Sequence, residues 1–131
     1  MYEAKIIAPI RFSDYVSNLV PTRKKTGEIR LCVDFKNLNK FSLKDKYPLP
    51  KMDHILQRVV GPTRISLLDG FSGYDQILVH PYDQAKTAFD TPWGTFMYVK
   101  IPFRLKNAGA MFQRAMDIAF AKEIHDFLVN T

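Results

Sequence analysis

The chain has 131 residues, the length of one typical domain, and its 47% hydrophobic and 24% charged residues fit an ordinary soluble globular protein. No run approaches the roughly 18 apolar residues of a membrane span, and the N-terminus lacks a signal-peptide pattern, so no membrane partner is expected. The single cysteine, Cys32, excludes an intramolecular disulfide and a paired-cysteine metal site, which favours a reducing compartment.

The net charge of +6 lies entirely in the first part of the chain. Residues 1–51 hold 11 Lys or Arg and 5 Asp or Glu, whereas residues 52–131 hold 8 of each kind. A one-sided basic region favours a polyanion partner, because phosphate contacts release condensed counterions. A solvated lysine-rich surface is the alternative interpretation.

The first predicted supersecondary structure is a basic β-hairpin. Residues 1–17 are mixed in character and interrupted by proline, so they predict an irregular lead-in or a short helix. Two strands follow, one starting at residues 18–22 and one over residues 29–35, where apolar and polar side chains alternate. The turn between them is at residues 26–28, so Arg23, Lys24 and Lys25 lie near the tip of the hairpin.

The middle of the chain predicts an extended segment, a helix and two short strands. Residues 36–50 are polar and end in Tyr-Pro-Leu-Pro, which favours an extended, helix-free segment. A helix is expected over residues 51–60, where apolar residues fall on one helical face before Gly-Pro ends it. Strands are expected at residues 63–68 and 76–79.

The last third predicts a second hairpin and a closing helix. The hairpin strands are residues 86–91 and 95–101, on either side of Pro92-Trp93-Gly94. The helix is expected to start near Asn107, which can cap it. Its apolar stripe comprises Phe112, Ala115, Met116, Ala119 and Phe120. This mixed order predicts an α+β (mixed α/β) fold with a largely antiparallel sheet and packed helices.

One stretch, residues 66–77, reads SLLDGFSGYDQI, and its opening apolar run ends at an acid, Asp69. Asp-Gly between apolar runs is a strong hairpin signal. A carboxylate that ends a buried strand beside a Gly-loosened turn can also hold a metal ion against a substrate phosphate. The local pattern leaves both interpretations open.

Several runs occur together, in order, along nearly the whole chain: residues 29–40, 45–50, 68–77, 86–89, 92–96, 101–103, 105–110 and 112–116. They resemble the reverse transcriptase (RNA-directed DNA polymerase) of gypsy-like LTR retrotransposon pol polyproteins, in the plant type. The resemblance implies a partial right-hand polymerase fold in one partial domain. Fingers are expected at about residues 1–47 and 78–106, and palm at about residues 48–77 and 107–131.

The resemblance also implies a role for each matching residue. Asp69 matches the catalytic, metal-binding aspartate, and the carbonyl of Gly70 is a further ligand for Mg²⁺ in two-metal nucleotidyl transfer. Lys36 and Lys106 match template or primer contacts. The nucleotide-binding residues would be Lys24, Arg30, Ser72, Gly73, Tyr74 and Phe103. Tyr74 would be the steric gate against a ribose 2′-hydroxyl, whereas a core Tyr74 and solvated Lys24 and Arg30 are the alternatives.

The chain departs from the family pattern at two places. Arg104 stands where the family has Gly, and a Gly there indicates a close backbone approach or an unusual φ/ψ, so the long cation could block the nucleotide or template path or swing to solvent. Residues 126–131 end where the family continues into Tyr-x-Asp-Asp, and no two adjacent residues of the chain are both acidic. We therefore expect a truncated or decaying fragment whose parent carries out RNA-directed DNA synthesis and which is itself inactive.

The expected partners are an RNA or DNA template–primer, dNTPs and the remainder of the pol polyprotein, namely palm, thumb and RNase H. For the parent, an intracellular site is expected, in a cytoplasmic particle or the nucleus. A non-catalytic nucleic-acid-binding remnant of a decayed element is the alternative function. A third possibility is an inert, poorly folded remnant, because a lost strand would expose a sheet edge.

Overall fold

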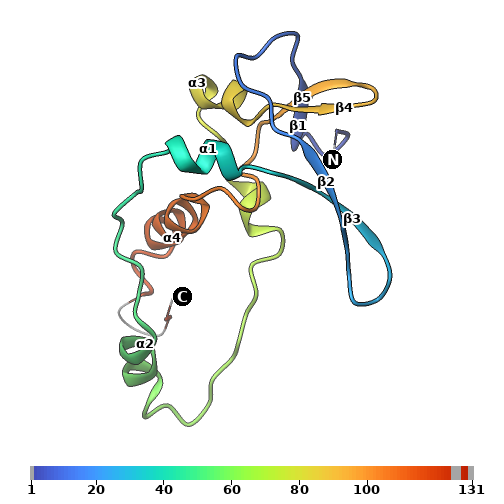
Figure 1. The fold of residues 1–131 in the computed structure, drawn as a ribbon. Coiled ribbons are helices and arrows are strands. Elements are labelled where there is room, and N and C mark those ends of the chain that lie inside the picture. The colour runs from blue at the N-terminus through green and yellow to red at the C-terminus, as the bar shows by residue number, and fades with distance from the viewer. Residues whose placement is uncertain (1, 125–127, 130–131) are drawn as a thin grey trace.

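Two small antiparallel sheets form the framework of the computed structural model, which describes residues 2–124, 128 and 129. One sheet has the strand order β1 (Ile7–Pro9), β5 (Gly94–Tyr98) and β4 (Phe89–Thr91). The other is the hairpin of β2 (Leu19–Arg23) and β3 (Ile29–Val33). Both sheets lie at the same end of the molecule (Figure 1).

The helices extend away from the sheets. They are α1 (Lys36–Phe41), α2 (Met52–Val59), α3 (Pro81–Gln84) and α4 (Ala108–Ala119), with two 3₁₀ turns, η1 (Gly73–Gln76) and η2 (Ala85–Thr87). In Figure 1, α4 lies next to α1, and α2 lies at the far end, joined by long extended segments on either side. No described helix is long and apolar enough to cross a membrane.

The first hydrophobic cluster joins the two sheets to α1. Its buried members are Val33, Phe35, Phe89 and Tyr98, and Leu38 of α1 packs against them. The rings of Phe35 and Tyr98 meet edge to face with centroids 6.0 Å apart. Burial raises the pKa of the Tyr98 hydroxyl above its usual range, as expected for a phenol in an apolar core.

A second cluster joins the sheets to α4. Val79, Ile101 and Ala108 are buried there, with the half-buried ring of Tyr74 packed against them. Leu105 contacts both clusters. Residues 101–108 therefore couple the sheets to the helical half of the molecule.

The turn η1 packs against α4 through a contact that requires glycine. A β-carbon built at Gly73 would lie 2.6 Å from Cε2 and 2.9 Å from Cζ of the Phe112 ring, closer than real β-carbons approach. The neighbouring Tyr74 ring lies 5.2 Å from the Phe112 ring, centroid to centroid. Gly73 thus lets η1 lie directly on α4.

The structure confirms the mixed helix and antiparallel-sheet class, both predicted hairpins, and the helices that became α2 and α4. The strands of the second hairpin are shorter than predicted: β4 starts at Phe89 because residues 85–87 form η2, and β5 ends at Tyr98. The apolar face predicted for the first hairpin is buried only at its base. Val33 and Phe35 are buried, whereas Ile29 and Leu31 are exposed, because the hairpin extends beyond the core.

The helix-free prediction for residues 36–50 is wrong over α1. The Asp34 carboxylate accepts a hydrogen bond from the Lys36 amide and so satisfies one of the free donors at the start of the helix. Leu38 then packs into the first cluster. Tertiary packing and a local side-chain contact outweigh the polar composition, and only residues 42–51 are extended.

The strands predicted around Asp69 are also wrong. Residues 63–68 form no ladder and are exposed, with Leu67 at 95% and Leu68 at 90% of full exposure. Gln76 belongs to η1, and Leu78 makes only an isolated bridge to Lys100. The stretch is therefore not a hairpin, since an apolar run becomes a strand only where a neighbouring strand supplies hydrogen bonds.

Two terminal predictions need smaller corrections. The N-terminal lead-in contains β1, because Ile7–Pro9 finds a partner strand in β5. Along α4, Phe112, Ala115 and Met116 are half-buried, but Ala119 and Phe120 are exposed beyond the second cluster. Asn107 precedes α4 without capping it, since its side chain bonds the Leu43 carbonyl and the Asp45 amide instead.

Replacing Ile101 by Ala should lower the free energy of unfolding by about 2–5 kcal/mol, because the side chain is only 1% exposed in the second cluster. Ile118, on α4, is 72% exposed, so Ile118→Ala is the matched control and should stay within about 0.5 kcal/mol of the parent. Urea denaturation measures both variants. Equal midpoints for the two would contradict this account of the core.

Gly73→Ala should destabilise the protein by about 1–3 kcal/mol, because its new methyl group overlaps the Phe112 ring. In a Phe112→Ala background the same change should cost much less, as a double-mutant cycle would show. Gly109→Ala, in open space on α4, should instead stabilise by about 0.5–1 kcal/mol. A penalty at Gly73 that is independent of Phe112 would refute the contact.

Candidate nucleotide and nucleic-acid site

The turn that carries Asp69 is closed by its own backbone. The Gly73 amide donates to the Gly70 carbonyl at 3.1 Å, and the Gln76 side-chain amide donates to the Phe71 carbonyl at 2.9 Å. Asp69 and Gly70 are both exposed at the end of the extended segment. One lone pair of the predicted ligand carbonyl of Gly70 is therefore already engaged.

Asp69 does not form a metal site with other described side chains. Among residues 2–124, 128 and 129, no group of three or more His, Cys, Asp or Glu side chains could hold a metal ion. A divalent cation with oxygen ligands needs several of them, usually with more than one carboxylate. The residues present therefore do not fit a complete two-metal centre.

The structure brings Tyr74 and Phe103, both predicted to bind the nucleotide, next to each other. Their ring centroids lie 6.3 Å apart in an edge-to-face arrangement. Phe103 is 69% exposed, whereas Tyr74 is half-buried between Phe103 and Phe112. Tyr74 has a core contact, and its role as a sugar gate stays a prediction.

The other two residues of this turn have structural explanations of their own. Ser72 adopts a left-handed conformation with φ 47°, and its carbonyl accepts from the Asp75 amide at 2.9 Å. The small size of Gly73 is required by Phe112. A triphosphate contact at either residue is compatible with these features and stays a prediction.

The predicted fingertip cations share one face of the first hairpin. Thr22 pairs with Arg30, so strand alternation places Lys24 on the same face as Arg30. Both side chains are exposed, and Lys24 forms an ion pair with Glu28. The hairpin tip lies apart from η1 in Figure 1, so these cations and Tyr74 form two separate groups.

A side-chain clamp that the sequence did not reveal holds the predicted template-contact region together. The Asn39 side chain donates to the Arg104 carbonyl at 2.8 Å and accepts from the Lys106 amide at 2.7 Å. The Lys106 ammonium donates to the carbonyls of Asn39 and Ser42 at 3.3 and 2.9 Å, near the end of α1. Lys36, at the start of α1, is exposed.

A second polar network ties residues 45–47 to α4. Arg114 binds both carboxylate oxygens of Asp45, at 3.1 and 2.9 Å, and its guanidinium lies 4.7 Å from the Tyr47 ring centroid. The Tyr47 hydroxyl donates to Asp117 at 2.6 Å, and this hydrogen bond raises the pKa of Tyr47. Single polar residues in a basic stretch carry no spacing signal, so neither network was predictable.

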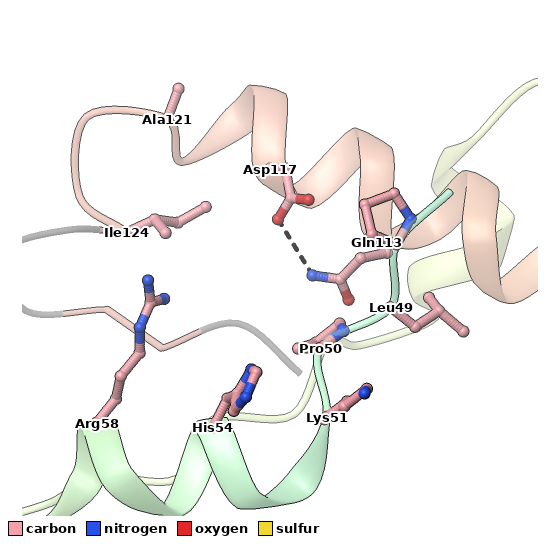
Figure 2. A pocket seen from close by; sticks show the side chains of 10 residues that line it. Leu49, Pro50, Lys51, His54, Arg58, Gln113, Asp117, Ala121 and Ile124 are labelled. Atoms are coloured by element: carbon pink, nitrogen blue, oxygen red, sulfur yellow. Dashed lines mark hydrogen bonds between the residues drawn. The ribbon is translucent and has the colours of Figure 1, made fainter. Parts of the chain in front are cut away.

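A pocket of about 590 Å³ lies between α2 and α4 (Figure 2). Lys51, His54 and Arg58 line it from the α2 side, and Gln113 and Asp117 face them from α4. None of the predicted nucleotide-binding or metal-binding residues contributes to its wall. The pocket is therefore separate from the candidate site.

Comparison with known sequences assigns the chain to a family. The family model for reverse transcriptase (RNA-dependent DNA polymerase) matches residues 22–129. The Pol polyprotein of the transposon 412 from Drosophila melanogaster is 37% identical over 123 residues, which are 89% of this chain and 10% of the polyprotein. An RNA-directed DNA polymerase homolog from Oenothera berteroana is 35% identical over 101 residues, covering 77% of this chain and 71% of that protein.

Solved structures share the fold. The native prototype foamy virus protease–reverse transcriptase matches with a TM-score of 0.70 at 19% identity, over 90% of this chain and 16% of that one. The foamy viral enzyme in complex with dsDNA matches with a TM-score of 0.72 at 16% identity, over 92% of this chain and 25% of that one.

The chain thus spans about a tenth of the length of the transposon 412 polyprotein and a larger share of the shorter plant homolog. The gypsy Pol polyprotein of Drosophila melanogaster is likewise 37% identical over 95 residues, covering 72% of this chain and 9% of the polyprotein. The chain belongs to the reverse transcriptase family, as part of the reverse transcriptase domain found in the pol polyproteins of LTR retrotransposons.

Proposed function

We propose that this chain forms the fingers and part of the palm of an RNA-directed DNA polymerase, which builds DNA from dNTPs on a template. The fingers would comprise residues 1–47 and 78–106, and the palm residues 48–77 and 107–131. The observation that carries the proposal is the meeting of Tyr74 and Phe103, the palm and fingers residues that would enclose the nucleotide sugar. The clamp of Asn39 on residues 104–106 supports it, because the clamp positions Phe103 relative to α1.

The proposed metal chemistry needs more ligands than the described residues supply. Reverse transcriptases generally use divalent metal ions, and we propose Mg²⁺ with Asp69 and the Gly70 carbonyl among its ligands. Such ions activate the primer hydroxyl and neutralise the charge of the leaving pyrophosphate. Because the described residues offer no group of three ligands, further carboxylates from the intact polymerase would be required.

Nucleic acid is the proposed macromolecular partner. The basic first part of the chain, with exposed Arg30 and Lys36, supports phosphate contacts. A foamy viral protease–reverse transcriptase that shares the fold has been solved in complex with dsDNA. The remaining palm, thumb and RNase H parts of a pol polyprotein are further proposed partners.

A non-catalytic nucleic-acid-binding protein is the second candidate function. The observation that favours it is the exposed Asp69 without a described group of metal ligands around it. Both candidates predict nucleic-acid binding, and only the first predicts that this chain supports synthesis inside an intact polymerase. The primer-extension experiment below separates the two candidates, and the binding experiment after it tests the interface that both require.

In a full-length polymerase that contains this chain, Asp69→Asn should reduce primer extension with Mg²⁺ by about a thousandfold or more. The physical reason is the loss of a metal ligand that contributes several kcal/mol of transition-state stabilisation. Asp75→Asn, in the same stretch, is the control and should retain activity. Extension that survives Asp69→Asn would remove this residue from catalysis, and the 131-residue chain alone should not extend a primer.

The 131-residue chain should bind a primer–template duplex with an affinity that falls steeply between about 50 and 200 mM salt. Combined replacement of Lys24 and Arg30 by Ala should lower that affinity about tenfold, as expected for the loss of two phosphate contacts. Lys86→Ala is a matched control, because Lys86 is also exposed and ion-paired, with Asp83. Fluorescence anisotropy measures the affinities, and binding that ignores ionic strength would argue against the proposed interface.

A further inference from the structure

Arg104 combines an exposed cation with a backbone conformation that costs free energy. Its φ is 79°, in the left-handed region where a side chain beyond glycine is strained. Only two other non-glycine residues among those described share a positive φ, Lys5 and Ser72. Strain of this kind persists only where surrounding contacts impose it, and it is concentrated at functional sites.

The contacts that hold the Arg104 segment come from α1. Asn39 binds the Arg104 carbonyl and the Lys106 amide, so both ends of the Arg104–Lys106 segment are fixed by one side chain. Lys106 strengthens the attachment through its ammonium, which donates to the carbonyls of Asn39 and Ser42. The Arg104 backbone is therefore attached to the C-terminal half of α1.

This attachment gathers positive charge at one place. Lys36 and Lys40 lie one helical turn apart on α1, on the same side of the helix, and both are exposed. Asn39, the neighbour of Lys40 in α1, holds the backbone of Arg104 and Lys106 against the same helix. We define these four residues, Lys36, Lys40, Arg104 and Lys106, as the α1 cationic patch.

No described acid neutralises this patch by an ion pair. The Asp45 carboxylate is bound bidentately by Arg114, and Asp34 accepts from the Lys36 backbone amide. Among the residues that the structure describes, none forms a hydrogen bond or salt bridge with the Arg104 guanidinium. An unneutralised cluster of cations on a rigid element is a binding surface for a polyanion with repeated phosphates.

We propose that Arg104 is a phosphate-binding residue for the nucleic-acid backbone and that its strained backbone is retained for this contact. The inference rests on the proposed function and adds a specific residue to it. Lys36 and Lys106 were predicted as template contacts from the family pattern, whereas Arg104 replaces a glycine of that pattern. The cation therefore adds a phosphate contact that a glycine cannot make, at a cost in stability.

The test separates charge from strain with three variants of the 131-residue chain. Arg104→Gln removes the charge and keeps a β-carbon, Arg104→Gly removes both, and Arg104→Lys keeps the charge. Binding of a labelled primer–template duplex is measured by anisotropy at several salt concentrations, together with thermal unfolding. Lys122→Gln, an exposed cation beyond α4, is the matched control for loss of one charge.

The Gln and Gly variants should weaken binding and lower the slope of log K against log salt by about 0.9, the value for one phosphate contact. The Lys variant and the Lys122 control should keep the parental slope. Arg104→Gly should also raise the melting temperature by about 5 °C, because relief of strain stabilises a domain of this size by that order. Arg104→Gln should unfold near the parental temperature.

Each contrary result of this experiment rules out a different claim. If Arg104→Gln binds with the parental affinity and slope, Arg104 does not contact phosphate and the inference is overturned. Tighter binding by the Gln or Gly variant would overturn it in favour of a side chain that obstructs the nucleic-acid path. If the parental chain shows no salt-dependent binding, the proposed function itself fails, and an unchanged melting temperature for Arg104→Gly would refute the strain.

Discussion

The attachment of residues 101–108 to α1 is the constraint on which the rest of this structure depends. Leu105 supplies the apolar part, since it packs against the first cluster together with Leu38 of α1, and it also reaches the second cluster, where Ile101 is buried. Asn39 supplies the polar part by binding residues 104 and 106. Buried apolar contacts give such a junction its free energy, whereas the asparagine hydrogen bonds define its register, because both groups of the amide are used.

This junction determines which candidate site residues meet. Phe103 precedes the clamped segment, and its ring reaches Tyr74 of η1, which packs in turn on Phe112 of α4. Lys106 is drawn onto α1 by the same clamp. The nucleotide side and the template side of the candidate site are thus connected through a few residues. A substitution of Asn39 would therefore alter the positions of residues on both sides.

Arg104 adds positive charge to the surface around α1, but its backbone conformation is strained. Arg104 begins the segment that Asn39 binds at both ends, and it adopts a left-handed conformation that glycine would adopt without cost. An arginine at this position adds a positive charge to the α1 cationic patch, and its left-handed backbone lowers the stability of the fold. Proteins commonly retain such strained residues where binding benefits, and lose stability as a result.

Much of the fold was accessible from the sequence because it is encoded locally. Period-two alternation located the first hairpin, the Pro-Trp-Gly turn located the second, and helical periodicity with a Gly-Pro stop located α2. Local patterns gave wrong predictions where the conformation of a segment depends on whether another element packs or pairs with it. Residues 63–68 read as a strand but have no ladder neighbour, whereas residues 36–41 read as helix-free but fold onto the core through Leu38.

For the candidate site, the sequence by itself determined the family, the identity of the acid at Asp69 and the replacement of a family glycine by Arg104. These follow from residue order and residue type, which do not depend on packing. Only the tertiary structure decided that Tyr74 meets Phe103, that Lys24 and Arg30 lie apart from them, and that Asn39 joins α1 to residues 104–106. Contacts between residues about 30 to 70 positions apart depend on how the elements pack, and no local pattern along the chain records that packing.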